Sequence, residues 1–163
     1  GDVYKRQSTE KVFNLAKAVQ RLVDEKGQED PYLISIGDKA ERIIQIFIDR
    51  QKTTLETMDE LKGIIIEITM ARKEQDAKGL SGLTFSIYWV LKQMKMENPE
   101  PLSEAMKGLL DEHPHWSYSE DQLRGIKQEM YKLLLEAGVD VEQVKGQVDH
   151  IMRILRGFQG HEA

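Results

Sequence analysis

Residues 36–72, IGDKAERIIQIFIDRQKTTLETMDELKGIIIEITMAR, decide the fold of this chain. They contain two sets of apolar residues separated by the polar segment 50–54 (RQKTT). Within each set, residues three or four positions apart lie on one face of a helix. We expect the other segments to pack around two such long helices, because their apolar faces need cover from water. The first set is Ala40, Ile43, Ile44, Phe47 and Ile48, and the second is Leu55, Met58, Leu61, Ile65 and Ile68.

The polar segment between the two sets leaves two arrangements open. Thr53 is followed three residues later by Glu56, which is the pattern of a capping box and favours a new helix at this point. Nothing in the segment forbids a single helix from about 38 to 78, however. The sequence therefore allows one central helix or two.

The same periodicity predicts further helices that start and stop at caps and breakers. No alternating strand-like run and no internal repeat is present in the sequence. We therefore predict an all-α fold, a helical bundle of six or seven helices built around two long central helices. The further segments are Ser8 or Thr9 to about Gly27, a start between Pro31 and Asp38, 83–96, 102–111, Ser119 to Gly138, and Asp140 to about Gly157.

The length of 163 residues fits one domain. Gly1 resembles the residue left after removal of a tag, and 2–7 resemble a translated adapter tail, so we expect 1–7 to be a scar. On this interpretation the natural chain began upstream and the protein is a C-terminal fragment. We predict a single helical domain over 8–157 and a frayed tail over 158–163.

Charge and composition exclude several classes of protein. The formal net charge of −5 argues against a domain that grips nucleic acid, because phosphate neutralisation needs surplus Lys and Arg. The chain has no cysteine, hence neither a disulfide framework nor a thiolate metal site, which fits the cytoplasm. No apolar run approaches the roughly 20 residues of a membrane span, and no signal peptide is visible.

The histidines provide the strongest candidate for metal chemistry. His113 and His115 flank Pro114, with Asp111 and Glu112 just before them, and imidazole and carboxylate groups are common ligands. No other histidine lies nearby, so a short polar loop is the better interpretation. A di-iron bundle needs Glu-x-x-His on two helices, whereas the one instance here contains the proline. We predict no catalytic residue, no cofactor and no metal in this chain.

The aromatic residues allow two interpretations. Trp89, beside Phe85 and Tyr88 in the sequence, fits a core position, whereas Trp116 precedes a helix and fits a plug over the end of the bundle. Tryptophan is also enriched at binding hot spots. The candidate partner-contact residues are Arg50, Gln51, Tyr88, Trp89 and Trp116. The alternating charges elsewhere are typical of a solvated helical surface.

Several short sequence motifs occur in order along most of the chain. They are 31–40 (PYLISIGDKA), Asp49-Arg50-Gln51 leading through Thr53 and Thr54 to Leu55-Glu56, Gly79-Leu80-Ser81, the helix with Phe85 and Tyr88, and Trp116 ahead of a helix that ends Lys132-Leu133-Leu134. In this order they resemble the C-terminal helical domain of the type I restriction enzyme R subunit. That subunit is an ATP-dependent DNA translocase and endonuclease.

The resemblance implies a docking or scaffold role without a catalytic site in this fragment. The expected partners are the methyltransferase and specificity subunits of the complex or the helicase lobes of the parent chain, with DNA contacted only indirectly. The parent would be a type I site-specific deoxyribonuclease with ATPase activity. The alternative is a stand-alone helical protein-interaction module with an unrelated partner. An enzyme with a pocket in the bundle and a direct DNA-binding protein are weaker hypotheses.

Overall fold

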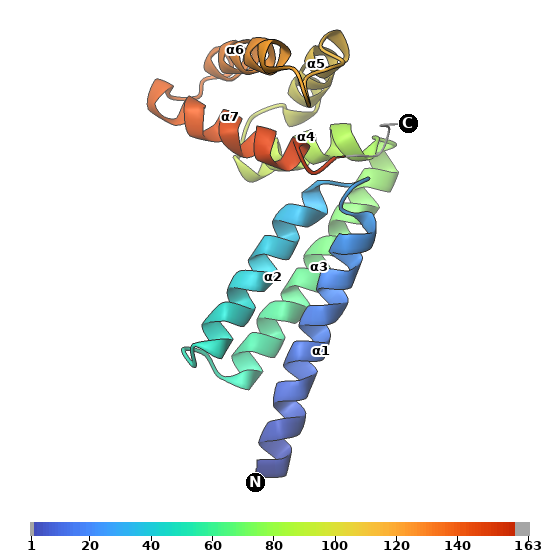
Figure 1. The fold of residues 1–163 in the computed structure, drawn as a ribbon, viewed down its shortest axis with the longest axis vertical. Coiled ribbons are helices and arrows are strands. Elements are labelled where there is room, and N and C mark those ends of the chain that lie inside the picture. Colours follow the sequence, from blue (N-terminus) through green and yellow to red (C-terminus); the bar gives the residue numbers. More distant parts are fainter. Residues whose placement is uncertain (1, 159–163) are drawn as a thin grey trace. The chain divides into compact units, whose positions relative to one another are not determined.

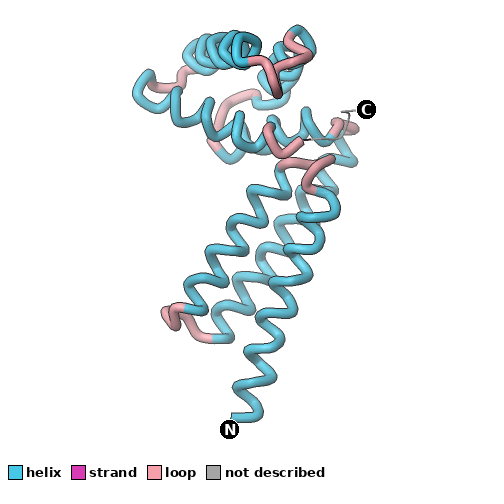
Figure 2. The backbone as a smooth tube through the Cα atoms, viewed as in Figure 1, coloured by secondary structure: helices cyan, strands magenta, loops and turns pink. Residues whose placement is uncertain are grey.

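The computed structural model describes residues 2–158, which form seven α-helices and no strand (Figure 1, Figure 2). The predicted all-α fold with six or seven helices is confirmed. Contacts between Cα atoms group the described residues into two compact units, the first made of 2–28 and 33–79 and the second of 29–32 and 80–158. The single domain over 8–157 stays a prediction, and it requires the two units to unfold together.

Unit 1 contains the three helices that run side by side in Figure 1. The first helix begins at Asp2, ahead of the predicted start at Ser8 or Thr9, because neither glycine nor proline interrupts the chain before Gly27. The expected scar at 2–7 is thus helical, and the expected frayed tail lies outside the described residues except for Phe158. The bounds are α1 (Asp2–Lys26), α2 (Tyr32–Ile48) and α3 (Thr54–Lys78).

The stretch 36–72 forms two helices. Arg50 adopts a left-handed backbone with φ of 59°. Its N–H donates to the Phe47 carbonyl at 2.9 Å, and the Gln51 N–H donates to the Ile46 carbonyl at 3.1 Å, which is the Schellman arrangement that ends a helix. Three residues later Thr53 Oγ1 accepts from the Glu56 N–H at 3.1 Å. The predicted cap at Thr53 is therefore confirmed.

The open start of the second helix is also settled. The helix begins at Tyr32, directly after Pro31, and Gly37 lies inside it. A Cβ on Gly37 would come within 2.9 Å of Val23 Cγ2 on α1. The missing side chain lets the backbone of α2 approach α1, so this glycine serves helix packing and does not break the helix.

The buried face of α3 differs from the predicted one. Leu61 and Ile68 are buried as expected, but Leu55 is 73% exposed and Ile65 is 37% exposed, so the prediction is wrong for these two. Ile48 at the end of α2 is exposed as well. Three consecutive isoleucines at 64–66 cannot share one face of a helix, and packing selects the first of them. The buried side chains are Thr57, Leu61, Ile64, Ile68 and Ala71.

Unit 2 is organised around a buried helix. Every residue from Leu83 to Leu91 in α4 is buried, and the helix contacts both α5 and α7, which are bridged by α6. The predicted helix start at Ser119 is confirmed, because Ser119 Oγ accepts from the Gln122 N–H at 3.3 Å and caps α6. The bounds are α4 (Gly82–Gln93), α5 (Pro99–Glu112), α6 (Glu120–Glu136) and α7 (Val141–Leu155).

The segment 29–32 binds closely to α4. The Tyr32 N–H donates to Ser86 Oγ at 3.0 Å, and that hydroxyl donates to the Gly82 carbonyl at 2.6 Å. The Tyr32 ring meets the Phe85 ring edge-on with centroids 5.0 Å apart. A Cβ on Gly82 would overlap the Glu29 carbonyl oxygen. Glycine at position 82 is thus a condition of this contact.

We expect the substitution Gly82→Ala to lower the free energy of unfolding by about 1–3 kcal/mol, the range for a forced overlap in a packed region. Gly146→Ala is the matched control, because a Cβ there meets nothing within 4 Å and Gly146 lies inside α7. This control should raise stability by about 0.5–1 kcal/mol through helix propensity. Urea unfolding followed by circular dichroism measures the free energy of unfolding of both variants. Equal effects would show that the close approach of Glu29 to Gly82 does not limit stability.

Candidate docking surface

The structure separates the five residues predicted to contact a partner. Arg50 and Gln51 are exposed in the turn between α2 and α3, and they belong to unit 1. Tyr88 and Trp89 are only 6% and 5% exposed, which confirms the core interpretation of Trp89. Trp116 is half-buried in the turn before α6. Because Tyr88 and Trp89 present so little surface, we keep Arg50, Gln51 and Trp116 as candidate contacts.

The histidine loop is held together by its own hydrogen bonds. His113 Nδ1 donates to the Leu109 carbonyl at 2.8 Å, and His115 Nδ1 pairs with the Tyr118 hydroxyl. The His115 N–H donates to Gln122 Oε1 at 2.7 Å. Within the described part of the chain, no three His, Asp or Glu side chains converge as a metal site would require. The hydrogen bonds of this loop are therefore those of a polar turn.

Exposed large apolar side chains concentrate on unit 1. Ile66 and Met70 are 58% and 65% exposed, on a face of α3 away from its buried side chains. A helix that is apolar on opposite faces is typical of a buried position, so an exposed one marks a surface that another element can cover. In unit 1 these side chains are Phe13, Ile48, Leu55, Ile65, Ile66 and Met70, and in unit 2 they are Tyr118, Leu135 and Val141.

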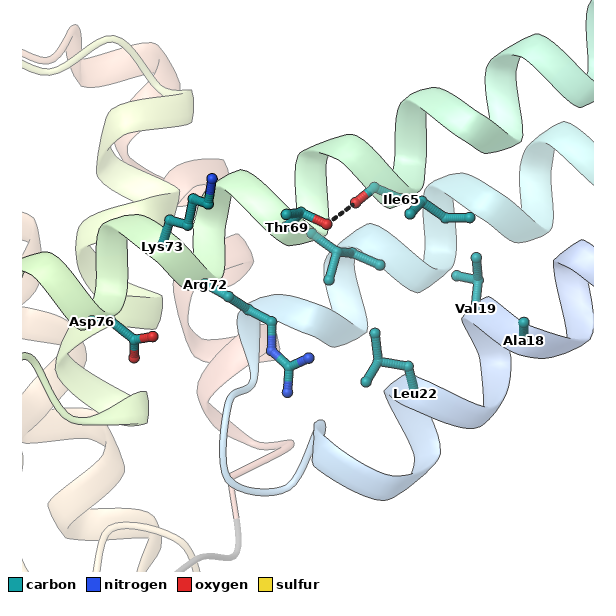
Figure 3. A pocket seen from close by; sticks show the side chains of 9 residues that line it. Ala18, Val19, Leu22, Ile65, Thr69, Arg72, Lys73 and Asp76 are labelled. Carbon is teal, nitrogen blue, oxygen red and sulfur yellow. Dashed lines mark hydrogen bonds between the residues drawn. The ribbon is translucent and has the colours of Figure 1, made fainter.

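The two flanks of α3 differ in how they are closed. On the side of α2, Lys39 forms an ion pair with Glu67 at 2.8 Å, and Lys52 forms one with Glu60. On the side of α1, a groove of about 420 Å³ remains between the helices (Figure 3). The flank of α3 that faces α2 is thus covered by ion pairs, whereas the flank that faces α1 remains accessible. The groove is lined by Ala18, Val19, Leu22, Ile65, Ile68, Thr69, Arg72, Lys73 and Asp76.

The groove has an apolar floor and a charged end. The Thr69 hydroxyl donates to the Ile65 carbonyl at 2.9 Å, so the hydroxyl hydrogen is already engaged. Arg72 extends beside Leu22, whereas Lys73 points away from α1 (Figure 3). Neither cation has an ion-pair partner among the residues that the structure describes. The floor can take an apolar side chain, and Arg72 can take a carboxylate beside it.

Sequence reasoning did not identify this groove. The signal in the sequence is the run Ile64-Ile65-Ile66, which supplies more apolar faces than one neighbouring helix can cover. Which helix lies on which flank of α3 depends on the packing of α1 and α2. The groove therefore becomes visible only in three dimensions.

Comparisons with known proteins give no family for this chain. Neither family models, nor the curated proteins, nor the solved structures contain a match to it. Among the described residues, no helix combines the length and the apolar character that crossing a membrane requires.

The pKa of His150 departs from its ordinary value. Burial lowers the pKa of His150 on α7 from its usual value of 6.5, and the positive charge of Arg153 lowers it further. The unfolded chain therefore takes up a proton at a higher pH than the folded chain does, so stability falls as the pH drops through 6.5 towards the folded pKa.

We expect the substitution His150→Gln to reduce the loss of stability between pH 7.5 and pH 5.5, because the variant has no proton to take up at this position. Urea unfolding at both pH values measures the difference, with the unchanged chain as the reference. An unchanged pH dependence in the His150 variant would contradict this assignment.

Proposed function

We propose that this chain is a docking module without a catalytic site, which binds a partner protein through the exposed apolar surface of unit 1. The observation that carries the proposal is the second apolar face of α3, where Ile66 and Met70 remain exposed in a helix already packed on its opposite side. Exposed apolar patches on folded proteins mark interaction sites. The acidic net charge of −5 favours a protein partner over nucleic acid.

We assign the module to the C-terminal helical domain of a type I restriction enzyme R subunit, in the cytoplasm. The support is the resemblance of 31–40, of the turn around Arg50 and Gln51, and of the segment 79–81 that precedes α4. On this proposal the partner is the methyltransferase and specificity core or the helicase lobes of the parent chain. DNA is contacted only through the complex, and this part of the chain needs no cofactor.

The alternative is a stand-alone helical interaction module with an unrelated partner. The reading frame upstream of residue 8 separates the two hypotheses. Walker and helicase motifs in that frame would support the restriction subunit. A frame that encodes neither would contradict the assignment and leave the docking function to be tested alone.

We expect the full chain to bind the reconstituted methyltransferase and specificity core encoded beside its gene, and not to shift duplex DNA at about 150 mM salt. The double substitution of Ile66 and Met70 to Glu should weaken that binding at least tenfold, the scale of losing hot-spot side chains. Both side chains are exposed, so the fold should persist. Isothermal titration calorimetry measures the affinity, and circular dichroism checks the fold.

The matched control changes two exposed apolar side chains of unit 2, Leu135 and Val141, to Glu. This variant should bind the core like the unchanged chain. Equal binding by the unchanged chain and the two double variants would place the contact elsewhere. DNA binding without core binding would overturn the docking function.

A further inference from the structure

We propose that the groove between α1 and α3 receives an amphipathic helix of the partner, with an acidic side chain of that helix paired to Arg72. The inference rests on the proposed docking function and names the site and the chemical class of its occupant. It concerns the flank of α3 that faces α1, whereas the general docking proposal rests on Ile66 and Met70.

The shape of the groove fits a helix. The lining residues of α3 recur from Ile65 to Asp76 at helical spacing, which corresponds to about 16 Å or three turns along the axis. The walls are two packed helices, so a third helix can lie along them and pack its side chains between theirs. Helix-in-groove binding of this kind uses apolar anchors at helical spacing.

The openness of the groove favours a helix over a small apolar ligand. Ala18, Ile65 and Thr69 line the groove and remain exposed to solvent. An extended lipid chain in such a groove would leave one side in water. An amphipathic helix instead turns its polar side outward and buries only its apolar side.

The charges at the end of the groove favour an acidic occupant. Arg72 and Lys73 have no ion-pair partner among the described residues, in contrast to Lys39 and Lys52 on the opposite flank. Arg72 lies beside the apolar floor, where its guanidinium can form a bidentate contact with a carboxylate. Asp76, the remaining charged residue of the lining, disfavours a second acid one turn further along.

Two substitutions test the groove in the full chain. Ala18→Leu fills the floor from an exposed position of α1 with little loss of helix propensity, and Arg72→Glu reverses the charge at the end of the groove. The controls are Ala105→Leu on α5 and Arg42→Glu on α2, which are exposed helical positions outside the groove. The probes are the methyltransferase and specificity core and 20-residue peptides that tile the predicted helices of its subunits.

We expect calorimetry to show that at least one peptide with apolar residues at helical spacing and a net negative charge binds the unchanged chain. Ala18→Leu and Arg72→Glu should each weaken this peptide and the core at least tenfold, whereas both controls should change the affinity less than twofold. Replacing the acid of the peptide that pairs with Arg72 by lysine should restore binding to the Arg72→Glu variant.

The failures of the two proposals are distinguishable. If the unchanged chain binds neither the core nor any peptide, docking to this core is overturned, and the groove proposal falls with it. If the core binds the Ala18 and Arg72 variants as tightly as the unchanged chain, the groove is not the site, but the docking function stands. The chain could instead bind dodecanoate saturably and bind no peptide, with Ala18→Leu abolishing the dodecanoate binding. This result would contradict the proposal that a helix occupies the groove.

Discussion

The hydrogen bond from the Tyr32 N–H to Ser86 Oγ is the contact on which the start of α2 and the packing of α4 both depend. The first N–H groups of a helix have no partner within that helix, and buried ones must find a partner elsewhere. Here the Ser86 hydroxyl of α4 accepts from the N–H of Tyr32, which is fully buried. The same hydroxyl donates to the Gly82 carbonyl. The arrangement is possible only because Gly82 has no side chain in the path of the Glu29 carbonyl.

The same requirement for satisfied groups explains why α3 has one closed flank and one open flank. Lysines from α2 and from the turn before α3 reach Glu67 and Glu60, so that side of α3 is closed by charge as well as by packing. The α1 side has apolar side chains, the acid Asp76, and the cations Arg72 and Lys73, which form no ion pair among the described residues. Covering a surface of that composition lowers the free energy of the system, because apolar area leaves the water and the cations acquire partners.

The helical class, the caps at Thr53 and Ser119, and the burial of Trp89 could be predicted from sequence because each depends on residues within a few positions. The exposure of Leu55 and Ile65 could not, because both fit a helical stripe and only the positions of α1 and α2 decide which stripe is buried. The start of α2 stays open between Pro31 and Asp38 in the sequence for a related reason: the contact that explains Gly37 inside the helix is with Val23 on another helix. The groove required all three helices of unit 1 to be in place.

Arg72 and the apolar floor would contribute differently to a complex. In the free chain Arg72 is exposed, where an ion pair is worth about 0–1 kcal/mol and is screened by salt. Most of the affinity must therefore come from covering the apolar lining, at roughly 25 cal/mol per Å². Once the groove is covered, the pair lies in a less polar environment and a misplaced acid becomes costly. The apolar floor would then set how tightly the occupant binds, and Arg72 would set its register along α3.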